Sequence, residues 1–238
     1  MIDQAIAAPL AAALTAKGYE TLTAVQQAVL APEAQGRDVL VSAQTGSGKT
    51  VAFGIAIADQ ILAGQDKLLY ADSPLALVIA PTRELALQVA RELEWLYASA
   101  GAQIATCVGG MDYRSEKRAL DRGAHIVVGT PGRLRDHIDR KSLDLSGLRA
   151  AVLDEADEML QMGFVDDIEW TPVQRQRNAD GSESVVRHPW ARSRLTGSGS
   201  VVPNFARITS ASATLIAIPN CSPVLPSLGM LAFDVFGR

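Results

Sequence analysis

Short apolar segments recur along the first part of the chain, and each is followed by a polar turn or by a turn with glycine or proline. Their length and their Val, Ile and Leu content are typical of strands buried in a parallel sheet. These segments are residues 38–42, 75–80, 104–108, 125–129 and 150–153. The stretches between them, 49–63, 83–100, 115–122 and 131–140, are compatible with crossover helices. The alternation predicts an α/β fold with a doubly wound, mainly parallel sheet.

The composition restricts the class of protein further. The 238 residues, of which 48% are apolar, suffice for one large domain or for one domain with an extension. A net charge of −4 argues against a broadly basic surface for nucleic acid, although helix N-termini and backbone amides can bind phosphates locally. The apolar stretch 5–14 follows Asp3, lacks a basic flank and ends before Lys17, so it predicts an amphipathic helix and neither a signal peptide nor a membrane span.

Two cysteines, Cys107 and Cys221, are far apart in the sequence and match no metal-ligand spacing. A disulfide framework or a zinc site therefore has little support, and a reducing, cytoplasmic setting fits best. The histidines and the pair Trp95 and Tyr97 are expected to have structural roles. The mixed-charge stretch 114–118 is predicted to be a solvated helix face.

A phosphate-binding loop is predicted between the first strand and the following helix. Its glycines permit inward-facing backbone N–H groups, Lys49 offers a charge for the outer phosphates, and the hydroxyl of Thr50 suits Mg²⁺. The alternative is a Gly/Ser turn that only caps a helix. The loop residues are Ala43, Gln44, Thr45, Gly46, Ser47, Gly48, Lys49 and Thr50.

An acidic pair follows the strand at 150–153 directly, so its side chains are expected at the carboxyl edge of the sheet, where ligands bind in open α/β folds. Asp154 is predicted to hold Mg²⁺, and Glu155 to orient the water that attacks the terminal phosphate. The alternative is an acidic helix N-terminus that is stabilised only by the helix dipole.

Five motifs in order make the chain resemble a DEAD-box RNA helicase. Residues 154–157 spell DEAD, 43–50 read AQTGSGKT, and 81–86, 109–110 and 130–133 read PTRELA, GG and TPGR. The resemblance implies a RecA-like nucleotide-binding domain that uses ATP and Mg²⁺. It gives Lys49, Asp154 and Glu155 catalytic roles and Asp157 a role in coupling to a second domain.

The resemblance also extends upstream, where residues 18–26 look like the family's adenine-reading motif, although Leu22 and Ala24 stand where proline is usual. Gln26 would read the N6 and N7 edge of adenine, and Tyr19 would stack on the base. The alternative is that Gln26 is only a polar helix residue beside Gln27. The family's further aromatic residue near the chain start is absent.

The family assigns the intermediate motifs to the RNA sugar-phosphate backbone, which implies binding without base specificity. Each of these motifs stands where a strand gives way to a helix, so its amides can face phosphates. The residues concerned are Pro81, Thr82, Arg83, Gly109, Gly110, Thr130, Pro131, Gly132 and Arg133.

The regular pattern ends after Trp170. We predict an N-terminal helical segment over 1–34, a RecA-like domain over 35–170 and an atypical tail over 171–238, with 208–218 and 230–236 as candidate strands. Because Lys is absent from the tail, we hypothesise a reading-frame change or a truncated gene. The family's Ser-Ala-Thr motif has a counterpart at 212–214, either displaced by an insertion or present by chance, and its distance from the DEAD motif favours chance.

These features predict the first domain of an ATP-dependent RNA helicase. RNA-stimulated hydrolysis is expected to need a second RecA-like domain, supplied in trans if necessary, because an arginine finger accelerates phosphoryl transfer by about a thousandfold or more. The alternatives are a half-helicase module that binds nucleotide and RNA without turnover, and a P-loop ATPase that is unrelated to RNA.

Overall fold

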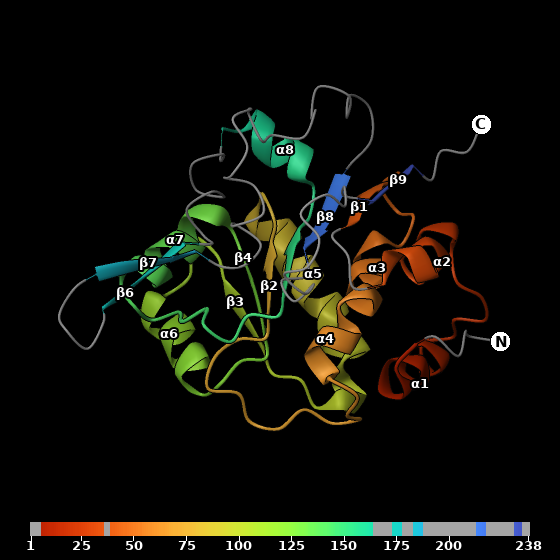
Figure 1. Ribbon diagram of the computed structural model, residues 1–238, viewed down its shortest axis with the longest axis horizontal. Helices are drawn as coiled ribbons and strands as arrows, with labels where there is room; N and C mark the ends of the chain where they lie inside the picture. The colour runs from red at the N-terminus through yellow and green to blue at the C-terminus, as the bar shows by residue number, and fades with distance from the viewer. Residues whose placement is uncertain are drawn as a thin grey trace.

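The computed structural model describes residues 6–35 and 39–163, together with four later strands at 173–177, 183–187, 213–217 and 231–234 (Figure 1). The helices are α1 Ala8–Ala16, α2 Ala24–Val29, α3 Lys49–Ala56, α4 Ala58–Leu62, α5 Arg83–Leu96, α6 Tyr113–Asp121, α7 Pro131–Asp139 and α8 Ala156–Gln161, with 3-10 turns at Pro32–Ala34 and Ala98–Ala100. The strands are β1 Val39–Ser42, β2 Ala76–Ile79, β3 Ile104–Cys107, β4 Ile126–Gly129, β5 Ala150–Leu153, β6 Val173–Arg177, β7 Glu183–Arg187, β8 Ala213–Ala217 and β9 Leu231–Asp234.

The sheet has seven strands in the order β3-β4-β2-β5-β8-β1-β9, and β6 pairs with β7 in a separate antiparallel ribbon. Strands β3, β4, β2 and β5 pair in parallel, and β1 pairs in parallel with β9. Strand β8 runs antiparallel to both β1 and β5, so β1 and β5 point in the same direction. The predicted α/β class and its mainly parallel sheet are confirmed.

Helices cover both faces of the sheet because its strands alternate their side chains between two cores (Figure 1). On β2, Ala76 and Val78 belong to the core shared with α1 to α5, whereas Leu77 and Ile79 belong to the core shared with α6, α7 and α8. All four side chains are at most 1% exposed. This two-sided burial explains why the strands are continuous apolar runs in the sequence.

Most helices begin at the residues that capping chemistry predicts. Thr23 and Gln26 form a reciprocal capping box at the start of α2, and Thr82 caps α5 through a hydrogen bond from the Leu85 amide. Asp112 caps α6 by accepting hydrogen bonds from two amides. Pro131 occupies the first turn of α7, where its missing N–H is not needed.

The predicted helix over 49–63 is wrong in one respect, since it is divided at Ile57 into α3 and α4. The Tyr97 hydroxyl donates a 2.7 Å hydrogen bond to the Gly54 carbonyl, near the end of α3. Glycine is also a poor residue for a helix interior. A side chain that enters the hydrogen-bond ladder next to a glycine is a known cause of such a break.

The N-terminal segment and the tail correspond partly to their predictions. Helix α1 packs on α5, and α2 packs on α3, so the segment before β1 shares the main core. Strands β8 and β9 fall within the candidate strands 208–218 and 230–236. Asp38, Trp170 and Ser212 lie outside the described residues, as does the proposed boundary at 170. In the described part of the chain, no helix combines the length and apolar character needed to cross a membrane.

Candidate functional site

Five of the predicted motifs converge on one edge of the sheet, because each of the five follows the carboxyl end of a strand. Along this edge, the loop after β3 comes first, followed by those after β4, β2 and β5, and the loop after β1 lies beyond β8. The phosphate loop and the acidic pair are therefore separated by a single strand, or by roughly 10 Å at the usual strand spacing. This arrangement places the two predicted halves of a nucleotide site side by side.

The phosphate loop has the backbone shape that anion binding requires. Gly46 and Gly48 have φ values of 81° and 87°, in the left-handed region that glycine adopts without strain. Gly48 is also the residue before α3, whose N-terminus faces the loop. Positive partial charge at a helix N-terminus and turned amides together favour a phosphate group.

Lys49 is buried with 9% of its surface exposed, and its ammonium group is held by the loop itself. Nζ donates to the Ala43 carbonyl at 2.9 Å and to the Gln44 carbonyl at 3.3 Å. Both acceptors belong to the loop that precedes α3. The charge is therefore already positioned inside the loop.

The hydroxyl of Ser47 supports the fit of a polar ligand. Its Oγ is a buried atom with no hydrogen-bond partner in the part of the chain that the structure describes. Buried polar atoms are rarely left unsatisfied, so an orphaned hydroxyl in this loop fits a ligand oxygen at that position. Thr50, the predicted metal ligand, lies half-buried in the first turn of α3.

Gln26 connects the predicted adenine motif to the phosphate loop. Its side chain is 1% exposed, its Oε1 accepts from the Thr23 amide at 3.0 Å, and its Nε2 donates to the Gly48 carbonyl at 3.4 Å. A Cβ at Gly48 would lie 2.6 Å from Gln26 Nε2, so only glycine allows this close approach. Both ends of the amide thus contact protein, as the structural interpretation of Gln26 expects.

Tyr19 packs against Trp95 of α5, a residue for which the sequence predicted a structural role. Its ring stacks on Trp95 with a centroid distance of 6.0 Å, and the Lys17 ammonium lies 5.2 Å from the Trp95 ring. Burial, followed by the charge of Glu92, raises the pKa of the Tyr19 hydroxyl. The base-stacking role of Tyr19 remains a prediction.

The acidic pair stands at the end of β5, as predicted. Asp154 is 3% exposed, and its amide donates to the Ile79 carbonyl at 2.9 Å, which fixes it against β2. Glu155 has a φ of 50°, a conformation that costs a non-glycine residue free energy and that concentrates at functional sites. Asp157 lies half-buried in the first turn of α8.

A third carboxyl group, which the sequence did not single out, interacts with the acidic pair. A hydrogen bond with Glu155 raises the pKa of Glu158, and burial and the charges of Glu155 and Asp157 act in the same direction. Glu158 therefore keeps its proton to higher pH than an ordinary glutamate. No group of three or more His, Cys, Asp or Glu side chains in the described ranges could hold a metal ion by itself. A Mg²⁺ that keeps water and phosphate ligands needs fewer protein groups.

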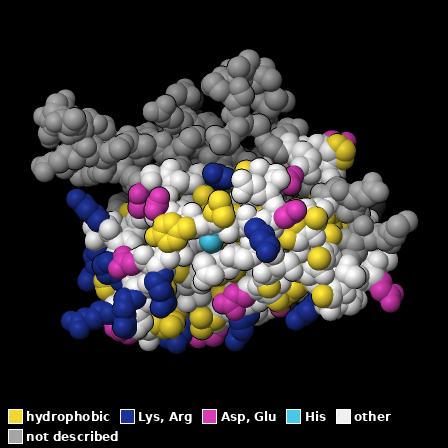
Figure 2. Space-filling view, turned by 90° about the horizontal axis from the view of Figure 1, so that it is seen from below, with side chains coloured by type: hydrophobic (Ala, Val, Ile, Leu, Met, Phe, Trp, Pro, Cys, Tyr) yellow, Lys and Arg dark blue, Asp and Glu magenta, His cyan; other side chains and the backbone are white. Residues whose placement is uncertain are grey.

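The three remaining motifs lie together on the other half of the same edge, since β3, β4 and β2 are neighbours. Gly109, Gly110 and Gly132 are exposed, and Thr82 and Thr130 are the residues before α5 and α7. Pro81 and Pro131 are buried. Figure 2 views the molecule from below, on the side opposite α8, and shows Lys and Arg side chains gathered toward the left of that face. That charge therefore lies away from the edge that carries the motifs.

The two motif arginines both contact other groups of the protein. Arg83 Nη1 donates to the Gly109 carbonyl at 3.0 Å. Arg133 is 17% exposed and forms a 2.7 Å ion pair with Glu116. Both side chains therefore organise the protein around the Gly109-Gly110 turn.

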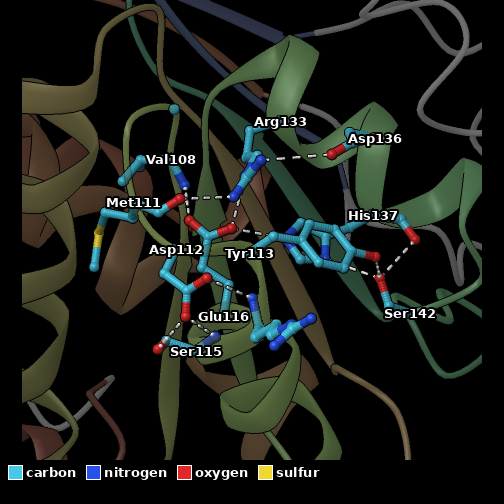
Figure 3. Close-up of polar contacts among 12 residues, drawn as sticks. Val108, Met111, Asp112, Tyr113, Ser115, Glu116, Arg133, Asp136, His137 and Ser142 are labelled. Carbon is cyan, nitrogen blue, oxygen red and sulfur yellow. Dashed lines mark hydrogen bonds and ion pairs between the residues drawn. The ribbon is translucent and has the colours of Figure 1, made fainter.

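Glu116 corrects the prediction that 114–118 is a solvated helix face. Arg114, Lys117 and Arg118 are exposed, but Glu116 is only 3% exposed and accepts hydrogen bonds from three residues (Figure 3). The error arose because charge composition was considered without helix periodicity. Glu116 is three residues after Tyr113, on the inward side of α6, and that spacing was the signal available in the sequence.

Comparison with known proteins gives consistent results. The profile of the DEAD/DEAH box helicase family matches residues 23–217. The chain is 43% identical over 213 residues to ATP-dependent RNA helicase DeaD of Klebsiella pneumoniae, covering 89% of this chain and 32% of that protein. It is 49% identical over 162 residues to the DeaD helicase of Haemophilus influenzae, covering 68% of this chain and 25% of that protein.

A solved structure agrees with the fold. The hypothetical ATP-dependent RNA helicase of Sulfolobus tokodaii aligns with a TM-score of 0.60 at 36% identity, over 68% of this chain and 45% of that chain. The chain spans about a third or less of the length of the two DeaD helicases.

The family match includes the Ser-Ala-Thr counterpart at 212–214, because it extends to residue 217. Ala213 pairs with Ser42 and Thr214 with Val41, between the strands that carry the phosphate loop and the acidic pair. The long interval after the DEAD motif had favoured chance. Strand β8 runs antiparallel to both neighbours, and the interpretation of 212–214 as a chance tripeptide stays a prediction.

Proposed function

Because the chain belongs to the DEAD/DEAH box helicase family and forms the N-terminal domain of a DEAD-box RNA helicase, we propose that it binds Mg-ATP and the sugar-phosphate backbone of RNA. RNA-stimulated hydrolysis would need a second RecA-like domain. The observation that carries the proposal is the single edge on which the phosphate loop, the acidic pair and the three backbone-binding motifs meet. The free, buried Cys107 thiol fits the reducing cytoplasm that we propose as its location.

On this proposal, bound Mg-ATP supplies the transferable terminal phosphoryl group and the charge of the metal ion. Lys49 exchanges its contacts with the Ala43 and Gln44 carbonyls for phosphate oxygens, which needs little movement because its ammonium group already lies in the loop. Ser47 Oγ gains the partner that it lacks among the described residues. Gln26 links the loop to α2, because its side-chain Nε2 donates to the Gly48 carbonyl.

Thr50 and Asp154 would hold the metal ion, and Glu155 would orient the attacking water. The Asp154 amide is fixed to β2, so the carboxylate is positioned before the ligand arrives. The left-handed backbone of Glu155 turns the chain sharply between β5 and α8. Asp157 would contribute to coupling with the second domain.

Calorimetric titration of the full chain with ATP and Mg²⁺ tests nucleotide binding. Lys49→Ala is expected to weaken binding about ten- to hundredfold, because a charge-assisted hydrogen bond to phosphate is lost. Lys67→Ala, which removes a lysine from an exposed loop position, is the matched control and should leave the affinity unchanged. Equal affinities for the parent chain and Lys49→Ala would overturn the assignment of the loop.

A module that binds nucleotide and RNA without turnover is a second candidate, because the chain spans only about a third or less of its curated relatives. Phosphate release measured with and without single-stranded RNA separates the two. Turnover that RNA stimulates when a second RecA-like domain is supplied in trans, and that Glu155→Gln abolishes, supports the enzyme. Binding without such turnover supports the module, and binding of nucleotide but not RNA would favour a P-loop ATPase unrelated to RNA.

A further inference from the structure

A buried carboxylate lies beneath the predicted RNA-binding loops and belongs to none of the motifs. Glu116 is on α6, and its side chain is 1% exposed (Figure 3). A buried charge is costly unless it is paired and fully hydrogen-bonded. Its partners therefore show what this charge does for the fold.

The two oxygens of Glu116 join the end of β3 to α7. Oε1 accepts a 2.9 Å hydrogen bond from the Val108 amide, immediately before Gly109. Oε2 accepts from Arg133 Nε at 2.7 Å and from His137 Nε2 at 2.8 Å. One carboxylate thus contacts the backbone of the Gly109-Gly110 turn and two side chains of the TPGR helix.

Both motif arginines also contact the backbone of the turn. Arg133 donates to the Met111 carbonyl at 2.9 Å, and Arg83 donates to the Gly109 carbonyl at 3.0 Å. Three backbone groups within four residues are therefore hydrogen-bonded by side chains. The Val108 amide donates to Glu116, the Gly109 carbonyl accepts from Arg83, and the Met111 carbonyl accepts from Arg133. The charges of the arginines are thereby directed to the protein backbone.

A second layer of contacts positions the ring of His137. Its Nδ1 lies 2.9 Å from Ser142 Oγ, which is also 2.7 Å from the Tyr113 hydroxyl. The Tyr113 ring stacks on the imidazole at 4.5 Å with an interplanar angle of 11°. Because an ionised carboxylate only accepts hydrogen bonds, Nε2 carries the proton that points to Glu116. The imidazole is fixed at both nitrogens and on one face.

We infer that Glu116 is a positioning residue for RNA binding: it sets the distance between the Gly109-Gly110 turn and the start of α7. A rigid spacing matters because two backbone sites can hold neighbouring phosphates only when their separation matches that of the strand, and supporting contacts are what hold such sites in place. The inference rests on the proposed RNA-binding function. It also assigns Arg133 a supporting role through Glu116 and Met111.

Glu116→Gln tests the inference through the sign of its effect. The variant keeps the shape but has one acceptor oxygen for three donors, so at least one donor faces the new NH₂ group. If Glu116 acted only as a negative charge near RNA, its removal would strengthen binding. A positioning role predicts the opposite sign.

The assay is fluorescence anisotropy of labelled single-stranded oligouridylate with the full chain, with calorimetry of ATP as a parallel measurement. We expect Glu116→Gln to weaken RNA binding about tenfold and to change ATP affinity by less than about twofold. Asp121→Asn is the matched control, because Asp121 is an exposed carboxylate of the same helix that pairs only with Lys117 among the described ion pairs. It should leave RNA affinity unchanged or slightly increase it.

A double-mutant cycle separates positioning from a general loss of structure. If Glu116 acts through the turn, its effect on RNA affinity should be non-additive with that of Gly109→Ala. RNA binding that is equal or tighter in Glu116→Gln would overturn the inference, as would equal losses of RNA and ATP affinity. If Glu116→Gln does not fold, Ser142→Ala replaces it as the test, because it is a milder change to the same cluster. Ser142→Ala should weaken RNA binding about threefold.

A failure of the proposed function can be distinguished from a failure of this inference. If the parent chain does not bind RNA, the proposed function fails. The role of Glu116 is then decided by hydrogen exchange of the Val108 amide, which should be at least about tenfold faster in Glu116→Gln than in the parent and unchanged in Asp121→Asn. Unchanged exchange in Glu116→Gln would refute the positioning role directly.

Discussion

Two exposed glycines at the sheet edge are not required by the fold. Cβ atoms built at Gly109 and Gly132 meet nothing within 4 Å, and neither residue has a positive φ. A glycine without a folding requirement is explained when another backbone must approach closely. On the proposed function, both residues are positions at which RNA approaches the protein backbone.

Gly109→Ala and Gly132→Ala are each expected to weaken RNA binding about ten- to hundredfold, the loss for one charge-assisted hydrogen bond to a phosphate. Their free energies of unfolding should stay within about 0.5 kcal/mol of the parent, or rise by up to about 1 kcal/mol for Gly132 in α7. Anisotropy and urea unfolding measure the two quantities. Gly101→Ala is a control for stability alone, because a φ of 73° makes alanine strained at that position. This variant should lower the free energy of unfolding and leave RNA affinity unchanged. Alanine variants that bind RNA like the parent would contradict this interpretation.

Cys107 gives a prediction about pH. Burial, followed by the charge of Glu116, raises the pKa of its thiol from 9.0 to about 12, with a smaller opposing effect of Arg133. Between these values the unfolded state loses the proton that the folded state keeps, so the thiol's contribution to stability falls as pH rises above about 9. Below about pH 9, the ordinary pKa that the thiol has in the unfolded state, its contribution to the free energy of unfolding is fully present.

Comparison with Cys107→Ala isolates this effect. The difference in free energy of unfolding between the parent and Cys107→Ala should decrease by roughly 1 kcal/mol between about pH 8 and about pH 10. Urea titrations of both proteins at the two pH values measure it. A difference that does not change with pH would show that the folded thiol ionises as easily as the unfolded one.

At the scale of elements, the junction of α3 and α4 depends on one hydrogen bond from a neighbouring helix region. The Tyr97 hydroxyl is buried, and its ring packs in the core that contains α3 and α5. Burial is also the largest cause that raises the pKa of Tyr97, so the hydroxyl stays protonated and acts as a donor. Gly54 permits the close packing, since a Cβ there would lie 2.6 Å from Leu96.

Tyr97→Phe is expected to lower the free energy of unfolding by about 1 kcal/mol, because the buried Gly54 carbonyl loses a partner. The melting temperature should fall by roughly 2–4 °C for a chain of this size. Tyr70→Phe is the control, as Tyr70 is 70% exposed and should be neutral. Calorimetry of both variants measures the two melting temperatures. Equal melting temperatures for Tyr97→Phe and Tyr70→Phe would refute the role of the Tyr97 hydroxyl.

The elements that could be predicted from the sequence are those that local chemistry determines. The β5 strand agrees at both ends, because a continuous apolar run meets an acidic turn at Asp154. The break at Ile57 could not be predicted, since it depends on Tyr97, which is distant in sequence. The buried state of Glu116 was missed for a different reason, because charge composition was considered without helix periodicity. Only its partners Arg133 and His137, which belong to another helix, needed the structure.

At the scale of the molecule, the sheet edge divides into two halves. The strands β3, β4 and β2 carry the backbone-binding motifs, whereas β5, β8 and β1 carry the acidic pair and the phosphate loop. Strand β2 pairs with β5 as well as β4, so the two halves meet between Ala80 and Asp154. The motifs made this arrangement predictable, but the reversed direction of β8 was not, because strand direction depends on the connection that precedes it.

Catalysis should show how much of the enzyme this chain provides. The proposed function assigns part of the transition-state stabilisation to a second RecA-like domain, so the residues of this chain are expected to hydrolyse ATP slowly by themselves. Loss of an arginine finger reduces phosphoryl transfer by about a thousandfold or more. The full chain should therefore release phosphate in the presence of single-stranded RNA at least about a thousandfold more slowly than the Klebsiella helicase, although it binds ATP. Glu155→Gln provides the background rate for both proteins. RNA-stimulated turnover within about tenfold of the relative, and abolished by Glu155→Gln, would mean that this chain alone completes the catalytic site.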